Sequence, residues 1–149
     1  HIVKAIDAGR IMLAADTLGA SQTMIDQAVD YAKERKQFGR AIGSFQAVKH
    51  MCAEMVADLG PCYALVWHAA HCHEGSPDEA KLMACHAKAH ISEMGKGIAK
   101  KATEVHGGMG FTDLLGLHYW FKRIGMNRQL LGSPELIREE AMKYQLLKK

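Results

Sequence analysis

The stretch Glu34-Arg35-Lys36-Gln37-Phe38-Gly39-Arg40-Ala41-Ile42-Gly43-Ser44-Phe45-Gln46 decides how this chain folds, because it separates two long helical patterns. Lysine and arginine followed by glycine are a common signal for the end of a helix. One aromatic residue of a kind usually buried, Phe38, lies between Arg35 and Arg40. This composition predicts a capped turn between helices. A second glycine cluster further along the chain supports a sharper interpretation, in which the stretch carries function.

On both sides of this stretch, apolar residues recur mostly at spacings of three and four, which is typical of helices with one buried face. Ser76 is placed to be the N-cap of a helix that begins at Pro77. No segment alternates convincingly with the two-residue period of a strand. The predicted helices cover approximately residues 2–36, 44–73, 77–105, 113–123 and 135–147.

These elements predict an all-α fold, an antiparallel four-helix-type bundle with extra short C-terminal helices, as a single domain over residues 1–149. Hydrophobic residues make up 48% and charged residues 23% of the chain, as in ordinary globular domains. The net charge of +3 is small and the basic residues are interleaved with acids, which argues against a nucleic-acid partner. No apolar run approaches about 20 residues, so no membrane span is predicted.

The first residue and the cysteines bear on the cellular context of the protein. The chain begins at His1 without a methionine or a signal-peptide pattern, so we expect part of a longer protein rather than a secreted precursor. The cysteines form no CxxC pair, and we expect free, mostly buried thiols in a reducing compartment. They are Cys52, Cys62, Cys72 and Cys85.

A glycine-rich loop follows the third predicted helix. Gly107, Gly108 and Gly110 permit positive φ and leave backbone N–H groups free, so an anionic group could approach them. The alternative is a helix C-cap followed by a tight turn. The spacing matches neither a P-loop nor a dinucleotide fingerprint.

Histidine is frequent, and two histidines four residues apart on a helix can bind one metal ion. The di-metal bundle pattern of inward-facing Glu and Glu-x-x-His repeats is missing from the sequence, however. Surface or core-satisfied histidines with no metal are the favoured interpretation, and a helical metal-binding module is the alternative. Its ligands would come from His68, His71, Cys72, His86 and His90.

Two motifs in register resemble those of the acyl-CoA dehydrogenase family. Tyr31-Ala32-x-Glu34-Arg35-Lys36-Gln37-Phe38-Gly39-Arg40-x-Ile42-x-x-Phe45-Gln46 resembles the flavin-contacting signature of that family. Val105-His106-Gly107-Gly108-Met109-Gly110-Phe111 resembles its glycine loop. The resemblance extends from about Ile6 to Leu147 and implies the C-terminal helical domain of a flavoenzyme, without the N-terminal helical and middle β domains.

The resemblance also implies a cofactor site. In such enzymes FAD lies at a subunit interface, and Arg35 and Phe38 would reach the pyrophosphate and flavin of the neighbouring subunit's FAD. An arginine suits this position because its planar fork matches phosphate oxygens. Ser133 stands in place of the usual threonine near the flavin, and Arg10 matches an arginine near the acyl-CoA substrate. The implied cofactor-binding residues are Arg35, Gln37, Phe38, Gln46, Gly107, Gly108, Gly110 and Ser133.

The implied reaction is α,β-desaturation of an acyl-CoA thioester, in which a base removes the α-proton as hydride passes from the β-carbon to flavin N5. The implied partners are the acyl-CoA, an electron acceptor such as a flavoprotein, and further subunits in a dimer, a tetramer or a hetero-oligomer. The expected location is the bacterial cytoplasm or, in a eukaryote, the mitochondrial matrix. The isolated domain should be inactive, because it lacks most of the flavin and acyl-CoA walls.

Several positions depart from the family pattern. The catalytic glutamate is replaced by Leu131 at its usual position and by Gly9 at its alternative position, so the base would be Glu135, a residue elsewhere in the protein or in a partner subunit, or absent. Glu104 replaces a glutamine and would repel a pyrophosphate unless it is paired or turned away. The segment Lys122-Arg123-Ile124 stands where Arg-Asp-Ala is usual. A catalytically silent subunit or oligomerisation domain is therefore the alternative function.

Overall fold

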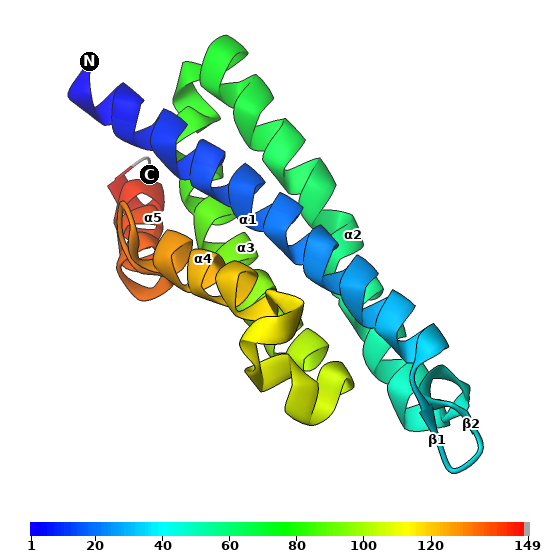
Figure 1. Ribbon diagram of the computed structural model, residues 1–149. Helices are drawn as coiled ribbons and strands as arrows, with labels where there is room; N and C mark the ends of the chain where they lie inside the picture. The colour runs from blue at the N-terminus through cyan, green and yellow to red at the C-terminus, as the bar shows by residue number, and fades with distance from the viewer. Residues whose placement is uncertain (148–149) are drawn as a thin grey trace.

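The computed structural model describes residues 1–147 and shows a helical bundle in which sequential long helices lie antiparallel (Figure 1). The helices are α1 (Ile2–Glu34), α2 (Gln46–Gly75), α3 (Pro77–His106), α4 (Leu117–Gln129) and α5 (Pro134–Leu147). The short elements are strands β1 (Lys36–Gln37) and β2 (Arg40–Ala41) and 3-10 turns η1 (Ile42–Ser44), η2 (Gly107–Phe111) and η3 (Asp113–Leu115). The all-α prediction is confirmed. Residues 148–149 of the predicted domain lie outside the described residues.

Helix α3 is the centre of the bundle and contacts α1, α2, α4 and α5. Small side chains allow this, since four neighbours can approach one helix closely only where its side chains are short. At Gly95 the approach leaves no room for a side chain: a Cβ atom there would lie 2.6 Å from Thr17 Cγ2 on α1 and 3.4 Å from Ile124 Cγ2 on α4. The buried alanines of α3 are Ala84, Ala87, Ala89, Ala99 and Ala102.

The connection between α1 and α2 differs from the predicted capped turn. The connection is not a plain turn but a small β-hairpin, in which Lys36 pairs with Ala41 and Gln37 with Arg40. Strands this short cannot be recognised by alternation. Phe38 occupies the tip of this hairpin and is 91% exposed, although phenylalanine is a residue type usually buried.

The fourth helix also differs from the prediction. Residues 113–115 form the 3-10 turn η3, and Gly116 in the left-handed region (φ 65°) separates it from α4. Helix α4 then begins at Leu117 and runs six residues past the predicted end at Arg123, to Gln129. The start of α3 agrees with the prediction, since Ser76 is the N-cap residue, although its hydroxyl makes no capping hydrogen bond.

The cysteines and the helix lengths agree with two sequence-based expectations. All four cysteines are free thiols; Cys62, Cys72 and Cys85 are buried and Cys52 is half-buried. Among the described residues, no helix has a sufficiently long apolar stretch to cross a bilayer.

Gly95→Ala should destabilise the fold, because the added methyl group meets Thr17 at the contact between α1 and α3. We expect a loss of about 1–3 kcal/mol, the usual cost of overpacking a well-packed site. The matched control is Gly97→Ala on the same helix, where the added atom meets nothing within 4 Å. That variant should gain up to about 1 kcal/mol of helix propensity. Urea unfolding of both variants tests the contact, and equal stabilities would contradict it.

Candidate functional site

The hairpin between α1 and α2 is formed by backbone pairing of β1 with β2. Its turn residues, Phe38 (φ 52°) and Gly39 (φ 76°), both have positive φ, as a two-residue hairpin turn requires. Glycine adopts this conformation freely, but for a bulky residue such as Phe38 it is strained. The Ile42 N–H donates to the Arg35 carbonyl at 2.7 Å and closes the base of the hairpin. The result is an aromatic ring held out from the bundle.

The glycine loop forms the 3-10 turn η2 after α3. Gly107 has φ 58°, which ends the helix, and Gly110 is buried, with a hypothetical Cβ atom only 2.7 Å from the Thr103 carbonyl oxygen. The loop is anchored by His106, whose Nδ1 lies 2.7 Å from the Ala102 carbonyl oxygen. No side chain larger than hydrogen therefore fits at Gly110 without movement of the backbone.

Hairpin and glycine loop meet across a groove of about 430 Å³. The groove brings together four of the predicted cofactor residues, Arg35 and Gln37 from the hairpin side and Gly107 and Gly108 from the loop. Its other lining residues are Tyr31, Ile42, Val105, His106 and Met109. A cavity with a cation on one wall and exposed glycine backbone on the other suits an anionic ligand.

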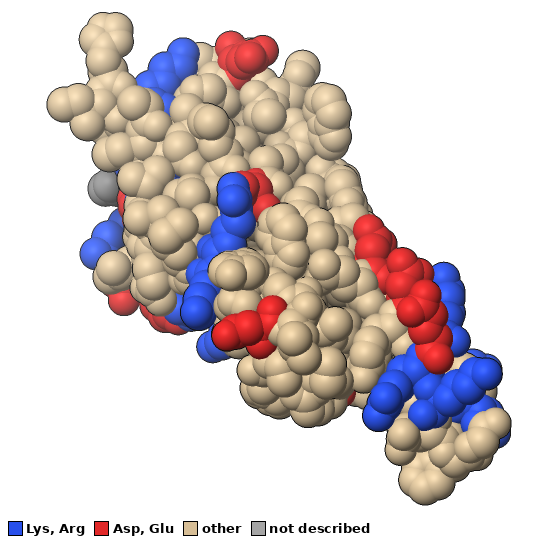
Figure 2. Space-filling view, viewed as in Figure 1, with Lys and Arg blue, Asp and Glu red and all other residues tan. Residues whose placement is uncertain are grey.

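The charge of this end of the molecule favours the same kind of ligand. Figure 2 shows lysine and arginine side chains gathered over the hairpin end of the bundle. The exposed basic residues of this segment are Lys33, Arg35, Lys36 and Arg40. Lys33 pairs with Asp30, whereas the Arg35 guanidinium has no ion pair or hydrogen bond within residues 1–147. Arg35 is therefore free to bind a ligand.

Glu104 lies beside this groove but does not line it. Its carboxylate is exposed and lies 3.8 Å from Lys100 Nζ, one turn back along α3. The repulsion expected from a carboxylate at this position is thus weakened by pairing.

The remaining predicted cofactor residues lie outside the groove. Phe38 is at the hairpin tip, with its ring 6.1 Å from that of Phe45, and Gln46 is the exposed first residue of α2. Gly110 is buried beneath the loop and shapes it rather than lining the groove. Ser133 lies near the opposite end of the bundle, in the turn that joins α4 and α5.

Arg10, the predicted substrate residue, is buried near the far end of α1. With a rise of 1.5 Å per residue, it is about 37 Å along the helix from Arg35. Its Nη2 donates to Glu140 at 2.8 Å, and its Nε donates to the main-chain carbonyl of Leu131 at 3.1 Å. The hydrogen bond from Arg10 lowers the pKa of Glu140 to about 2. The guanidinium therefore fixes the turn between α4 and α5.

At that turn, the two positions where the family pattern would place a catalytic glutamate, Leu131 and Gly9, are in contact. A Cβ atom built at Gly9 would lie 2.6 Å from Leu131 Cδ1, so the leucine side chain occupies the space above the glycine. Leu131 itself has a strained positive φ of 57°. Among the described residues, only Leu131 and Phe38 combine a side chain with positive φ. Neither position of the pair supplies a carboxylate.

Glu135, the candidate base from the sequence, is engaged by its neighbours. Hydrogen bonds from Ser133, from its own backbone N–H and from Arg128 lower its pKa to about 2. Its Oε1 lies 2.5 Å from Arg128 Nη2. A carboxylate held in this way is a weak proton acceptor.

Lys88 holds the same turn from the α3 side. It is only 1% exposed, and its ammonium group donates to Ser92 Oγ at 3.2 Å and to the carbonyls of Arg128 at 3.2 Å and Gly132 at 3.4 Å. No carboxylate pairs with it among residues 1–147. Burial lowers the pKa of Lys88 to about 8. Arg10 and Lys88 thus hold the Leu131–Gly132 backbone from two helices.

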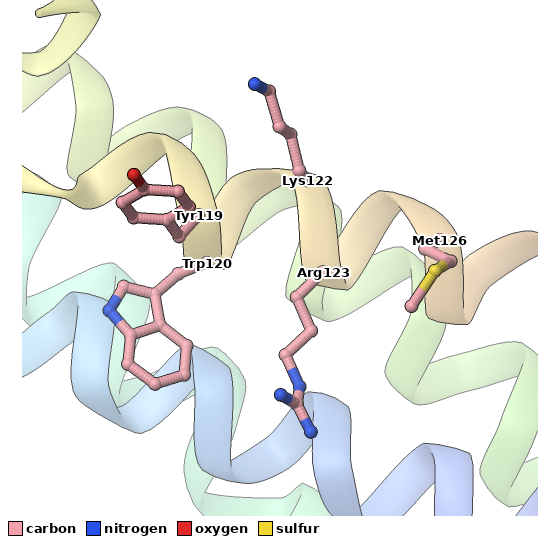
Figure 3. Close-up of a pocket in the computed structure, with 5 residues that line it drawn as sticks. All are labelled: Tyr119, Trp120, Lys122, Arg123 and Met126. Atoms are coloured by element: carbon pink, nitrogen blue, oxygen red, sulfur yellow. The ribbon is translucent and has the colours of Figure 1, made fainter. Parts of the chain in front are cut away.

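The family departure at Lys122-Arg123-Ile124 has a structural partner on α1. Arg123 donates from Nε to Asp16 at 2.8 Å, and Asn127 donates to the same carboxylate at 2.5 Å. Figure 3 shows the Arg123 side chain pointing toward α1 while Lys122 points away from it. The groove drawn there, of about 390 Å³, is lined by none of the predicted cofactor residues. The altered segment therefore attaches α4 to α1.

The domain has two centres, the groove near Arg35 and the turn at Leu131. Together with the fold they define a class of protein: a helical domain with a cationic groove at one end and a tightly held turn at the other. Residues 1–145 match the family described as "Acyl-CoA dehydrogenase, C-terminal domain". The chain belongs to this family, and the family resemblance in the sequence is confirmed.

Curated relatives carry the same domain at moderate identity. The chain is 38% identical over 128 residues to acyl-CoA dehydrogenase IpdE2 of Mycobacterium tuberculosis, covering 86% of this chain and 38% of that protein. It is 39% identical over 111 residues to the caffeyl-CoA reductase-Etf complex subunit CarC of Acetobacterium woodii, covering 74% and 29%. The chain thus spans well under half the length of these relatives.

Solved structures agree with the fold. Butyryl-CoA dehydrogenase from Megasphaera elsdenii superposes with a TM-score of 0.90 at 26% identity, over 97% of this chain and 37% of that chain. A chain from the structure of the electron transferring flavoprotein of Acidaminococcus fermentans gives a TM-score of 0.92 at 31% identity, over 99% and 38%.

Sequence reasoning missed Lys88, which supports the turn, and Asp16, which attaches α4 to α1. In the sequence, Lys88 resembles an exposed helix lysine. The only signal of its burial is that it shares a face of α3 with Ala84 and Ile91, one turn before Ser92. Asp16 likewise resembles an ordinary polar residue of a helix surface. Asp16 pairs with a residue more than a hundred positions away, and Lys88 bonds to a carbonyl forty positions away. No local sequence pattern encodes such contacts.

The depressed pKa of Lys88 predicts how stability depends on pH. The unfolded chain protonates this lysine up to its ordinary pKa of 10.5, but the folded protein only up to about 8. Between these values the unfolded state binds more protons, so the free energy of unfolding should rise with pH, by an amount on the order of 3 kcal/mol. Well below pH 8 this group is protonated in both states and contributes no slope.

Urea unfolding across this range measures the effect against two variants. Lys88→Met should remove the rise, whereas Lys96→Met, at an exposed lysine of the same helix, should retain it. Because other lysines, tyrosines and cysteines also titrate here, the informative quantity is the difference between wild type and each variant. Parallel curves for wild type and Lys88→Met would show that the buried ammonium is not destabilised.

Proposed function

We propose that the whole protein is an FAD-dependent acyl-CoA dehydrogenase that desaturates an acyl-CoA thioester at the α,β position. The observation that carries this proposal is the groove in which Arg35 meets Gly107 and Gly108, from segments about seventy residues apart. Bound FAD would accept hydride equivalents from the substrate. The residues of this chain would bind and orient the cofactor.

The groove fits a pyrophosphate for reasons of charge and shape. The guanidinium of Arg35 has no competing partner among the described residues, and bidentate hydrogen bonding to phosphate oxygens is its favoured interaction. Gly107 and Gly108 are exposed and offer main-chain atoms without side chains in the way. Phe38, exposed on the strained hairpin tip, would lie against the flavin of a neighbouring subunit, which requires an oligomer.

Partners follow from the same proposal. An acyl-CoA is the substrate, an electron-transferring flavoprotein is the electron acceptor, and further subunits complete the site as a homo- or hetero-oligomer. The names of the Acetobacterium relative and the Acidaminococcus structure support an acceptor of this kind. The cytoplasm or mitochondrial matrix remains a prediction.

A second candidate function is a flavin-binding subunit without its own base. It is favoured by the contact between Leu131 and Gly9, which leaves both family positions without a carboxylate. Glu135, with its pKa held at about 2, does not replace it as the chain is folded here. In this case the purified protein would bind flavin but not desaturate the substrate, because the base would be absent or supplied only by a partner subunit.

The first test is the visible absorption spectrum of the purified full-length protein, before and after anaerobic addition of a panel of acyl-CoAs. Bleaching of a yellow protein supports the dehydrogenase. A yellow protein that never bleaches supports the subunit that lacks a base. A colourless protein that takes up no added FAD contradicts both.

Arg35→Gln should weaken FAD binding by the full-length protein by about tenfold to a hundredfold, corresponding to the 1.5–3 kcal/mol of a charged hydrogen bond. Arg40→Gln is the matched control, because Arg40 is on the same hairpin but stacks on Phe45, with its guanidinium carbon 4.0 Å from the ring centroid. Fluorescence titration with FAD compares the two. Equal losses would mean that only overall charge matters and that Arg35 has no specific contact.

Leu131→Glu should increase the rate of bleaching by acyl-CoA, since it places a carboxylate where the family pattern has one. General-base catalysis typically contributes about 10²–10⁴-fold. The substitution preserves the contact from Arg10, which binds the main-chain carbonyl of Leu131. Leu130→Glu, at the exposed neighbouring residue, is the control. No gain with Leu131→Glu would show that the missing base does not limit the reaction.

A further inference from the structure

A cluster of three side chains that bind metals lies at the end of the bundle where α2 passes into α3. His68 and Cys72 are one turn apart on α2 and therefore share a face of the helix. Glu79 lies in the first turn of α3, after the Ser76-Pro77 connection. The ligand atoms of all three lie within 4.8 Å of one another. The predicted ligands His71, His86 and His90 are not part of this cluster among the described residues.

Two of the three distances between ligand atoms match a tetrahedral metal site. Zinc binds sulfur at about 2.3 Å and nitrogen or oxygen at about 2.0–2.2 Å, so neighbouring ligands of a tetrahedral ion are about 3.6 Å apart. His68 Nε2 lies 3.6 Å from Cys72 Sγ, and Cys72 Sγ lies 3.8 Å from Glu79 Oε2. With all three ligand atoms within 4.8 Å of one another, rotation of the exposed His68 and Glu79 side chains would complete the site. The same distances would also suit weak hydrogen bonds of the thiol, which is the alternative that an experiment must separate.

We propose that His68, Cys72 and Glu79 bind one zinc-like divalent cation, with water as the fourth ligand. A thiolate, an imidazole and a carboxylate together favour zinc over magnesium or calcium, which prefer oxygen ligands alone. Binding forms a metal–sulfur bond, and the thiol proton leaves for solvent. No electron is transferred.

The surroundings give the ion a structural task. Cys72 is buried, while His68 and Glu79 are exposed, so the ion can enter from solvent and remain anchored in the protein. It would join the end of α2 to the start of α3 and close the connection between them. Cys72 is 26 residues, or about 39 Å of helix, from Gln46 at the hairpin end. The site is therefore separate from the groove at Arg35, and its occupancy does not depend on flavin.

Cobalt titration of metal-free full-length protein tests the proposal directly. One equivalent of Co²⁺ should produce a thiolate-to-metal charge-transfer band in the near ultraviolet, and Zn²⁺ should displace it. Competition with a chromophoric chelator gives the affinity. Zn²⁺ should also raise the thermal unfolding temperature, because a ligand that binds only the native state stabilises it.

Variants decide which side chains bind. Cys72→Ser should abolish the band. Glu79→Gln should weaken the affinity for Co²⁺ by about tenfold to a hundredfold or more, since loss of an outer-shell partner alone costs that much. Glu79 is exposed, so this substitution does not endanger folding. Cys52→Ser and His71→Gln, on the same helix, should change neither. Absence of the band, a band that Cys72→Ser leaves unchanged, or an affinity that Glu79→Gln leaves unchanged overturns the proposal.

Discussion

The close approach of α1, α3 and α4 at Gly95 is the constraint on which the rest of the structure depends. A hydrogen atom at this position lets Thr17 and Ile124 come within contact distance of the α3 backbone. Asn127 then reaches both Asp16 and Thr17, and Arg123 reaches Asp16. The polar contacts between α1 and α4 therefore depend on how closely both helices pack against α3 at Gly95.

The two centres of the domain are built in opposite ways. The groove near Arg35 is open, and its cation is unpaired among the described residues. The turn at Leu131 is held by Arg10 and by Lys88, both buried and both bonded to main-chain carbonyls. Strained backbone occurs at both, in Phe38 and in Leu131, which agrees with the general tendency of strain to concentrate at functional segments.

The sequence predicted the long helices well because their apolar residues follow a helical period over many turns. The end of α1 was expected at Lys36 and lies at Glu34; the end of α3 was expected at Val105 and lies at His106. The hairpin could not be recognised, since its glycine and basic residues are the same signals that end a helix. Motif resemblance located the groove, whereas Lys88 and the contact between Gly9 and Leu131 arise only when distant helices pack.

Helix α1 carries Arg10 near its beginning and Arg35 directly after its end, so its length sets the distance between the two centres. Each residue of an α-helix adds 1.5 Å of length and about 100° of rotation. One residue inserted or deleted between these arginines would turn the hairpin away from the glycine loop, or break the contacts of α1 with α3. Among close homologues of this protein, residues on the outer face of α1 should therefore differ freely, while the number of residues between the two arginines stays constant.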